Sequence, residues 1–363
     1  MLIYVVTFFL LVARWKKVIY VLSKDRFIWV LIGIAVISFL WSDAPARTLS
    51  SSVGLIGTTL FGLYLATRYS LREQLELLAC MYGLAIVLSI LFAMALPKYG
   101  IMSGVHAGSF RGIYTHKNVF GKVITLGGVI FFLLAMNKQK HRLLPWCGFC
   151  LTIILLVLAK STTALSNLMI MLVALFVYRT CRLRYDLMIP AIFAIATVGV
   201  SFYMGFTENA DAWLGLVGKD TTLTGRTDMW PFVLEMIEKR PWLGYGYAAF
   251  WNGIDSESAY IVRALRWPVP NSHNGLLDLW IGLGALGGVT YLIGYSMNFL
   301  KGIVWVSLSR TSENLWPVLY MTYMVLANIT ETSLMVQNDI FWVLYVSVVL
   351  SILMPLKQQT LEA

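Results

Sequence analysis

Long apolar runs constrain the fold of this chain more than any other feature. A helix needs roughly 20 mostly apolar residues to cross a bilayer. Such runs cover residues 1–13, 27–41, 50–67, 75–96, 119–136, 143–160, 163–178, 187–205, 275–300, 315–330 and 340–356. The sequence therefore predicts an all-α fold, a polytopic transmembrane helical bundle of about 11 spans. The run at 1–13 is short and its basic residues follow it, so we expect a truncated helix, or a missing preceding one, rather than a signal peptide.

Composition supports this class. Of the 363 residues, 59% are hydrophobic and 13% are charged, whereas soluble domains run near 45–50% apolar and about 25% charged. A water-soluble globule of this size could not bury so much apolar surface. A soluble enzyme, a disordered chain and a fibrous repeat are therefore excluded.

The distribution of positive charge predicts the orientation. With the N-terminus outside, 16 of the 28 Lys and Arg residues fall in short inside segments, as cytoplasmic loops require. Six of the remaining 12 lie in one long outer loop, 206–274. We therefore expect a multi-pass protein with a cytoplasmic C-terminus, divided into N-terminal helices (1–205), the outer loop (206–274) and C-terminal helices (275–363).

The outer loop is rich in aromatic residues and partly periodic. Its stretch 227–240 predicts an amphipathic helix that lies on the membrane surface or caps the bundle. The apolar face is expected to hold Met229, Trp230, Val233, Leu234 and Ile237. Beyond it, Gly244 and Gly246 predict a turn at which the backbone can approach a ligand.

Polar residues gather at the outer ends of the spans in three clusters. The long loop contributes Arg263, Arg266, His273 and Asn274; the 97–118 loop contributes Arg111, His116, Lys117 and Asn118; Lys160 ends the sixth span. Positive residues are normally enriched in cytoplasmic loops, so these outer cations are unexpected. They suggest an anionic partner at the lipid headgroup level. The sequence leaves open whether the three clusters meet.

Several stretches resemble the O-antigen ligase and polymerase superfamily. They read G-R-T-D-M-W, P-W-L-G-Y-G and H-N-G-L-L-D-L-W-I-G-L-G-A-L-G within about 220–290, with a further match at R-G-I-Y-T-H-K-N-V-F-G. The resemblance implies a bacterial inner-membrane glycosyltransferase with its active site facing the periplasm. Such enzymes take a glycan from an undecaprenyl-pyrophosphate carrier and pass it to a lipid A core (ligases) or another repeat unit (polymerases).

The resemblance also assigns residue roles. Arg226 matches an arginine implicated in gripping the pyrophosphate, and His273 a histidine proposed to activate the acceptor hydroxyl. Residues 111 and 116–118 match the conserved segment of the earlier outer loop. Many ligases carry a Ser-Arg pair where this chain has Ser161-Thr162-Thr163. Lys160 is the nearest cation there, and the departure favours a polymerase over a ligase.

The chemistry of these residue types fits such a transfer. Negative charge builds up on the leaving pyrophosphate, and the planar arginine fork binds phosphate oxygens while staying charged. Histidine near its ordinary pKa suits removal of the acceptor proton. The four histidines form no zinc-like pair. We therefore expect a metal-independent, inverting transfer without a cofactor, and no nucleic-acid partner.

Each of these residues also has a structural interpretation. His273-Asn274 and His116 could cap helices, Arg226 could pair with Asp228 or lipid phosphate, and the outer cations, including Lys160, could anchor headgroups. The stretch G-L-G-A-L-G at 282–287 predicts close packing of small residues rather than a dinucleotide site. The alternative function is a transporter or flippase for a lipid-linked or anionic solute, which should show internal repeats or broken helices near the midplane.

Overall fold

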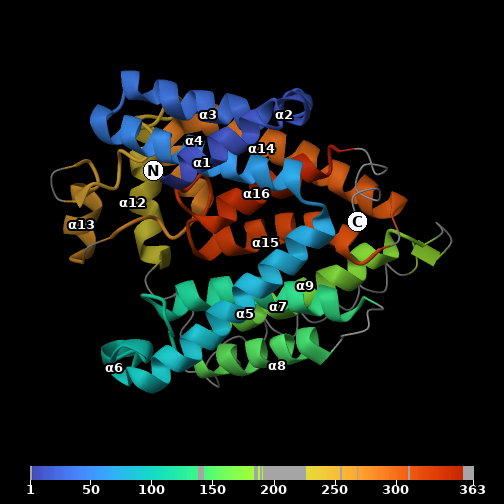
Figure 1. Cartoon of the computed structure of the whole chain (residues 1–363). Coiled ribbons are helices and arrows are strands. Elements are labelled where there is room, and N and C mark those ends of the chain that lie inside the picture. Colours follow the sequence, from blue (N-terminus) through green and yellow to red (C-terminus); the bar gives the residue numbers. More distant parts are fainter. Residues whose placement is uncertain are drawn as a thin grey trace. The chain divides into compact units, whose positions relative to one another are not determined.

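The computed structural model describes residues 2–137, 143–183, 226–253, 256–267, 269–309 and 311–354, together with 187, 188 and 190. The long helices are α1 (Leu2–Val12), α3 (Phe27–Ile37), α4 (Pro45–Arg68), α5 (Leu71–Ala95), α7 (Lys117–Ala135), α8 (Leu143–Leu158), α9 (Thr162–Thr180), α12 (Arg226–Lys239), α14 (Gly275–Leu308), α15 (Trp316–Thr330) and α16 (Ile340–Ser351) (Figure 1). Shorter pieces are α2 (Trp15–Leu22), α6 (Pro97–Gly100), α13 (Ala259–Leu265), and the 3₁₀ turns η1 (Ser38–Leu40), η2 (Gly104–His106) and η5 (Glu313–Leu315).

The all-α class is confirmed. Every predicted span except 187–205 overlaps a described helix, and that run lies almost entirely outside the described residues. Among the described helices, five are long and apolar enough to cross a membrane: α4, α5, α7, α9 and α14. Shorter apolar helices occupy Ile3–Val12, Phe27–Leu40, Leu143–Leu158 and Ile340–Ser351. The protein is therefore a multi-pass membrane protein.

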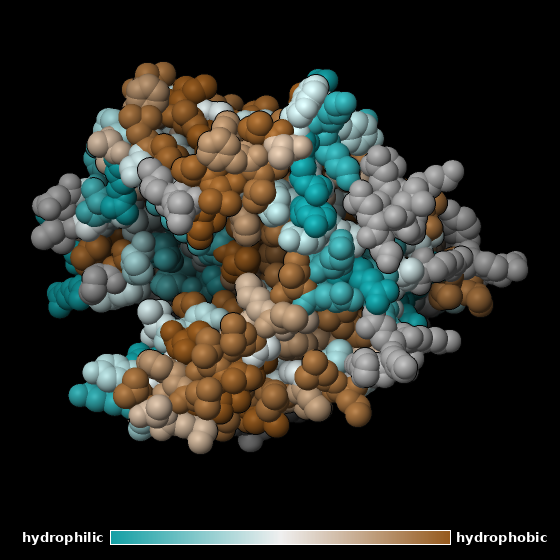
Figure 2. All heavy atoms as spheres, in the orientation of Figure 1, coloured by the Kyte–Doolittle hydropathy of each residue, from teal (hydrophilic) through white to brown (hydrophobic). Residues whose placement is uncertain are grey.

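Large hydrophobic side chains cover the outer faces of the helices. Met94 on α5, Leu143 and Leu144 on α8, and Leu300 on α14 are each more than 60% exposed. Figure 2 shows broad areas of hydrophobic residues on the side of the molecule that it presents. Lipid rather than water is the medium that makes such exposure favourable.

The chain groups into two compact units. Unit 1 comprises Met1–Arg68, Ser201–Lys301 and Met324–Leu361, and unit 2 comprises Tyr69–Val200 and Gly302–Tyr323, with the last two residues. In unit 1, α4 packs along α16. A Cβ atom at Gly62 would lie 2.7 Å from the carbonyl oxygen of Val343, so the small residue permits this close approach.

Unit 2 is built around α7, which packs against α5, α8 and α9 (Figure 1). Three glycines of α7 face these neighbours: a Cβ atom would lie 2.8 Å from Ala164 at Gly121, 3.0 Å from the Tyr82 ring at Gly127 and 2.7 Å from Thr152 at Gly128. The apolar runs thus become helices packed through small residues, as membrane helices commonly are.

Helix α14 is broken at Gly284, whose backbone has φ 61° and ψ −164°. The chain at 241–246 pairs with both sides of the break. The amides of Ala285 and Leu286 donate to the Pro241 and Trp242 carbonyls at 2.7 and 3.1 Å, and those of Tyr245 and Gly246 donate to Ile281 and Gly282 at 2.9 Å each. Backbone groups freed inside a bilayer must find such partners.

This pairing corrects one expectation and refines another. Gly244 was predicted to let the backbone approach a ligand, but a Cβ atom there would lie 2.6 Å from the carbonyl oxygen of Ile281. We call residues 241–246 the strap. Glycine is needed at position 244 because the strap lies directly against the backbone of α14. The small residues of 282–287 do allow close packing, but the strap and not another helix occupies the space.

Candidate functional site

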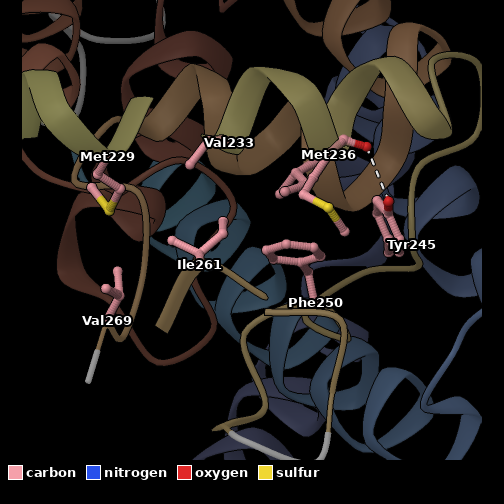
Figure 3. Packing of buried hydrophobic residues seen from close by; sticks show 8 residues of the cluster. Met229, Val233, Met236, Tyr245, Phe250, Ile261 and Val269 are labelled. Atoms are coloured by element: carbon pink, nitrogen blue, oxygen red, sulfur yellow. Dashed lines mark hydrogen bonds between the residues drawn. The ribbon is translucent and has the colours of Figure 1, made fainter. Parts of the chain in front are cut away.

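The described part of the long loop folds around its own apolar cluster. Met229, Val233 and Met236 of α12 pack with Tyr245, Phe250, Ile261, Val269 and Ile281, and all are nearly inaccessible. Figure 3 shows the α12 side chains pointing toward Ile261 and Phe250, with the Tyr245 hydroxyl donating to the Met236 carbonyl at 3.0 Å. The apolar face of α12 is therefore covered by protein.

The helix predicted over 227–240 is confirmed by α12, but its predicted inner face is partly wrong. Leu234 is 48% exposed and Met236 is buried instead. The buried stripe is rotated toward Met236 because α13 and residues 245–250 pack on that side. Periodicity identified the helix, whereas the neighbours decided its exact facing.

His273 lies two residues before the start of α14 in a strained conformation. Its φ is +52°, a left-handed value that few non-glycine residues adopt. The His273 amide donates to Asn271 Oδ1 at 2.9 Å. Asn274 Oδ1 accepts from the amides of Leu276 and Leu277 at 3.0 and 3.1 Å, which caps α14. The loop is therefore fixed on both sides of the histidine.

A carboxylate lies beside this imidazole. Glu331 follows the last residue of α15, and its Oε2 lies 3.5 Å from His273 Nδ1. The two side chains are only 23% and 18% exposed, and Nδ1 is buried without an aligned hydrogen bond to any described group. Both residues belong to unit 1. The arrangement presents a histidine with one nitrogen facing a carboxylate.

A second carboxylate, Asp278 in the first turn of α14, ties the surrounding segments together. Its Oδ1 accepts from Trp251 Nε1 at 2.8 Å and from the Ser272 amide at 3.0 Å. Its Oδ2 accepts from the Thr332 hydroxyl. One side chain therefore connects the long loop, the start of α14 and the segment after α15. We call His273, Asn274, Asp278 and Glu331 the histidine site.

The segment 331–339 joins α15 to α16 without a helix or strand, and its residues Ser333, Leu334 and Met335 are buried. Asn328 Oδ1 accepts from the amides of Ser333 and Leu334 at 2.7 and 3.1 Å, and a Cβ atom at Gly275 would overlap it. The buried Tyr247 hydroxyl donates to the Met335 carbonyl, and burial raises the pKa of this hydroxyl well above its usual range. The segment that carries Glu331 is therefore fixed by several buried bonds.

The long loop also carries the predicted arginines Arg226, Arg263 and Arg266. Arg226 begins α12, and its side chain lies outside the described atoms. Arg266 ends α13 in a left-handed conformation with φ 60° and is exposed. Arg263 lines a pocket of about 530 Å³ on unit 1, whose wall consists of Asp43, Ala44, Ala249, Phe250, Asn252, Ser256, Glu257, Ala259, Tyr260 and Arg263. The guanidinium of Arg240 pairs with Asp43, one of these wall residues, at 2.7 Å.

In unit 2 the structure brings together two of the predicted clusters. Lys117 Nζ lies 3.5 Å from the carbonyl oxygen of Lys160, because the N-termini of α7 and α9 pack side by side at Gly121. Arg111 shapes the same loop region, with Nε and Nη1 donating to the carbonyls of Tyr99 and Thr115 at 2.6 and 3.1 Å. We call Arg111, Lys117 and Lys160 the cationic cluster.

His116 caps α7, as its structural interpretation predicted. Its Nδ1 accepts from the Asn118 amide at 3.2 Å, and its ring meets that of His106 edge-on at 5.4 Å between centroids. Asn118 stands in the first turn of α7 and is partly exposed. A ligand role for His116 stays a prediction.

Two members of the histidine site, Asp278 and Glu331, are not among the predicted site residues. A signal existed for Glu331, because E-T-S-L-M-V-Q-N-D interrupts two apolar runs on the same predicted side as His273. In the described residues, no group of three His, Cys, Asp or Glu side chains is placed to hold a metal ion. The site offers instead an imidazole flanked by a carboxylate, which can accept a proton.

Comparisons with known proteins agree with the sequence resemblance. The O-antigen ligase family model (Wzy_C) matches residues 147–292, which include the described long loop, His273 and the break in α14. The exopolysaccharide production protein ExoQ of Rhizobium meliloti (strain 1021) is 25% identical over 255 residues, or 67% of this chain and 56% of ExoQ. The chain thus spans about half the length of that relative. Over these residues the chain is therefore similar to the O-antigen ligase family and to an exopolysaccharide production protein, in agreement with the resemblance found in the sequence.

Proposed function

We propose that the protein transfers a glycan from an undecaprenyl-pyrophosphate carrier to a sugar hydroxyl at the periplasmic face of the bacterial inner membrane. The observation that carries this proposal is the histidine site, where a conformationally fixed imidazole, itself within the family's matched region, faces the Glu331 carboxylate. The ExoQ name refers to exopolysaccharide production, which suits a polymerase or ligase of lipid-linked glycans.

The acceptor half of the reaction needs a base. In the proposed step, the acceptor oxygen attacks the anomeric carbon while His273 Nε2 takes the hydroxyl proton. The bond from the anomeric carbon to the phosphate oxygen breaks, and its electron pair leaves with the carrier pyrophosphate. This single displacement inverts the anomeric centre without a covalent intermediate. General-base assistance of this kind typically contributes about 10²–10⁴-fold.

The donor half of the reaction needs positively charged side chains beside the leaving pyrophosphate, which becomes more negative as the bond breaks. We assign this role to Arg226, because arginine stabilises phosphate charge without a metal ion. The cationic cluster of unit 2, taken by itself, is assigned to binding lipid phosphate. Asn118 and His116 stand at the same helix start as Lys117, and Arg266 adds exposed positive charge near the histidine in the sequence. Asn274 is assigned to substrate through its amide nitrogen, because its oxygen already caps α14.

The pocket at Arg263 suits the uncharged part of the donor or acceptor. It combines carboxylates, an amide, a hydroxyl and an exposed tyrosine, which are groups that bond sugar hydroxyls and cover sugar rings. The Asp43 carboxylate is already paired with Arg240, so the wall is nearly balanced in charge. We therefore assign Arg263 to glycan binding rather than to the pyrophosphate.

The transporter alternative has less support. A broken helix such as α14 is one feature of transporters, but the freed backbone groups of residues 281–286 are bonded to the strap at 241–246. They are therefore occupied and do not offer ligands to a solute. The proposal retains transfer as the function and does not require a moving element.

The test is transfer by the purified protein in liposomes supplied with the lipid-linked donor and acceptor. His273→Ala should lower the rate about 10²–10⁴-fold because the base is lost, and Arg226→Ala should lower it by weakening the grip on the leaving group. Arg72→Ala is the matched control, since Arg72 is exposed and pairs with Glu76, one helical turn away, at 3.0 Å. Full activity of His273→Ala would reject the proposal.

A further inference from the structure

We propose that Glu331 is a positioning residue for His273, which keeps the proton on Nδ1 so that Nε2 is the nitrogen that receives the acceptor proton. This inference rests on the proposed function of His273. It assigns a role to a residue that lies beyond the matched family region, 147–292.

The first argument is the local geometry. Glu331 Oε2 lies 3.5 Å from Nδ1, and both side chains are mostly covered. Nδ1 itself is buried, so water does not replace the carboxylate as its partner. A carboxylate accepts hydrogen bonds but donates none. The pair is therefore favourable when Nδ1 carries the proton, and in a neutral imidazole this leaves Nε2 unprotonated and basic.

The second argument is that the same bonds fix both partners. Asp278 accepts from the Ser272 amide, one residue before His273, and from the Thr332 hydroxyl, one residue after Glu331. Asn274 caps α14 on one side, and Asn328 accepts from the amides of Ser333 and Leu334 on the other. The two side chains therefore meet because their backbones are locked, unlike a surface ion pair formed by mobile chains.

The third argument concerns charge during the reaction. When Nε2 takes the proton, the imidazole becomes a cation, and the neighbouring carboxylate attracts it in a poorly solvated site. The left-handed backbone at His273 indicates that the chain tolerates strain to aim this ring. A carboxylate that orients a histidine and stabilises its protonated form is the general arrangement that assists a histidine base.

The kinetic test compares three substitutions at one position in liposome transfer assays. Glu331→Gln keeps the size but removes the charge, and we expect kcat to fall about 10²-fold or more while KM for the lipid-linked donor changes little. Glu331→Asp keeps a carboxylate and should recover part of kcat. Glu238→Gln, an exposed carboxylate on α12, is the matched control and should match the unmodified protein.

A second measurement does not depend on any variant at Glu331. Histidine labelled with ¹⁵N in the unmodified protein should show His273 as the Nδ1-protonated tautomer, with its signal identified by its loss in His273→Ala. An Nε2-protonated ring would overturn the inference, even if Glu331 variants prove unstable. In Glu331→Gln, which lacks the carboxylate, His273 should no longer prefer the Nδ1-protonated tautomer.

The outcomes separate the two proposals. If His273→Ala retains full transfer activity, the proposed function fails and Glu331 has no base to position. If His273→Ala is inactive but Glu331→Gln keeps the full kcat, the proposed function stands and the positioning role is overturned. If Glu331→Gln lowers thermal stability but changes neither kcat nor the His273 tautomer, Glu331 has a structural role alone. That result would also overturn the positioning role.

Discussion

Polar residues at helix ends have local bonding duties in this protein as well as their predicted chemical roles. Asn274 Oδ1 caps α14, and His116 Nδ1 caps α7. Arg111 donates to two backbone carbonyls of its own loop. Residue types and spacing identified these positions, but the same side chain can have both a structural and a chemical role. A useful substitution must therefore remove the atom needed for one role and keep the atom needed for the other.

Asn274 allows such a separation. Asn274→Ala should lose the cap and about 1 kcal/mol of stability. Asn274→Asp keeps the capping oxygen and places a negative charge at a helix N-terminus, where it is favourable, so its melting temperature should be unchanged. Because Asp lacks the amide donor assigned to substrate, we expect its KM for the donor to rise about tenfold. Unchanged kinetics in Asn274→Asp would identify the residue as a cap alone.

At the scale of elements, local patterns predicted the helices but not their distortions. Apolar runs gave α4, α5, α7, α9 and α14, because any helix that crosses lipid must satisfy its own backbone. The break at Gly284 could not be predicted, since it depends on pairing with 241–246, about 40 residues away in the chain. The inner face of α12 was partly misassigned for the same reason: α13 and residues 245–250 select it.

The break in α14 gives a prediction about stability. Gly284 has φ 61° and ψ −164°, a region that is essentially restricted to glycine, and a Cβ atom would overlap the Trp242 carbonyl. Gly284→Ala should therefore lower stability by at least about 1–3 kcal/mol and release the strap. Gly33→Ala is the control, because nothing lies within 4 Å of a Cβ atom there and alanine favours helix interiors. Thermal unfolding in detergent micelles measures both, and equal melting temperatures would contradict the prediction.

At the scale of the whole molecule, the sequence predicted candidate site residues better than it predicted which of them lie close together in space. Lys117 and Lys160 are 43 positions apart and were predicted as separate clusters, yet unit 2 brings them together. His273 was identified through the resemblance, whereas its partner Glu331, 58 positions later, was not. Hydropathy and motif spacing report local periodicity, and such long-range pairs arise only when packed helices bring their ends together.

The last prediction concerns the product that the cell makes. A polymerase joins repeat units to each other, so its loss leaves single units on the cell surface. A ligase moves finished chains, so its loss leaves long chains on the carrier lipid. Because Ser161-Thr162-Thr163 replaces the Ser-Arg pair of many ligases, we expect a deletion strain to accumulate single-unit glycans on a gel of its surface polysaccharides. Complementation with the unmodified gene should restore long chains and complementation with His273→Ala should not. Long chains bound to the carrier would instead identify the protein as a ligase.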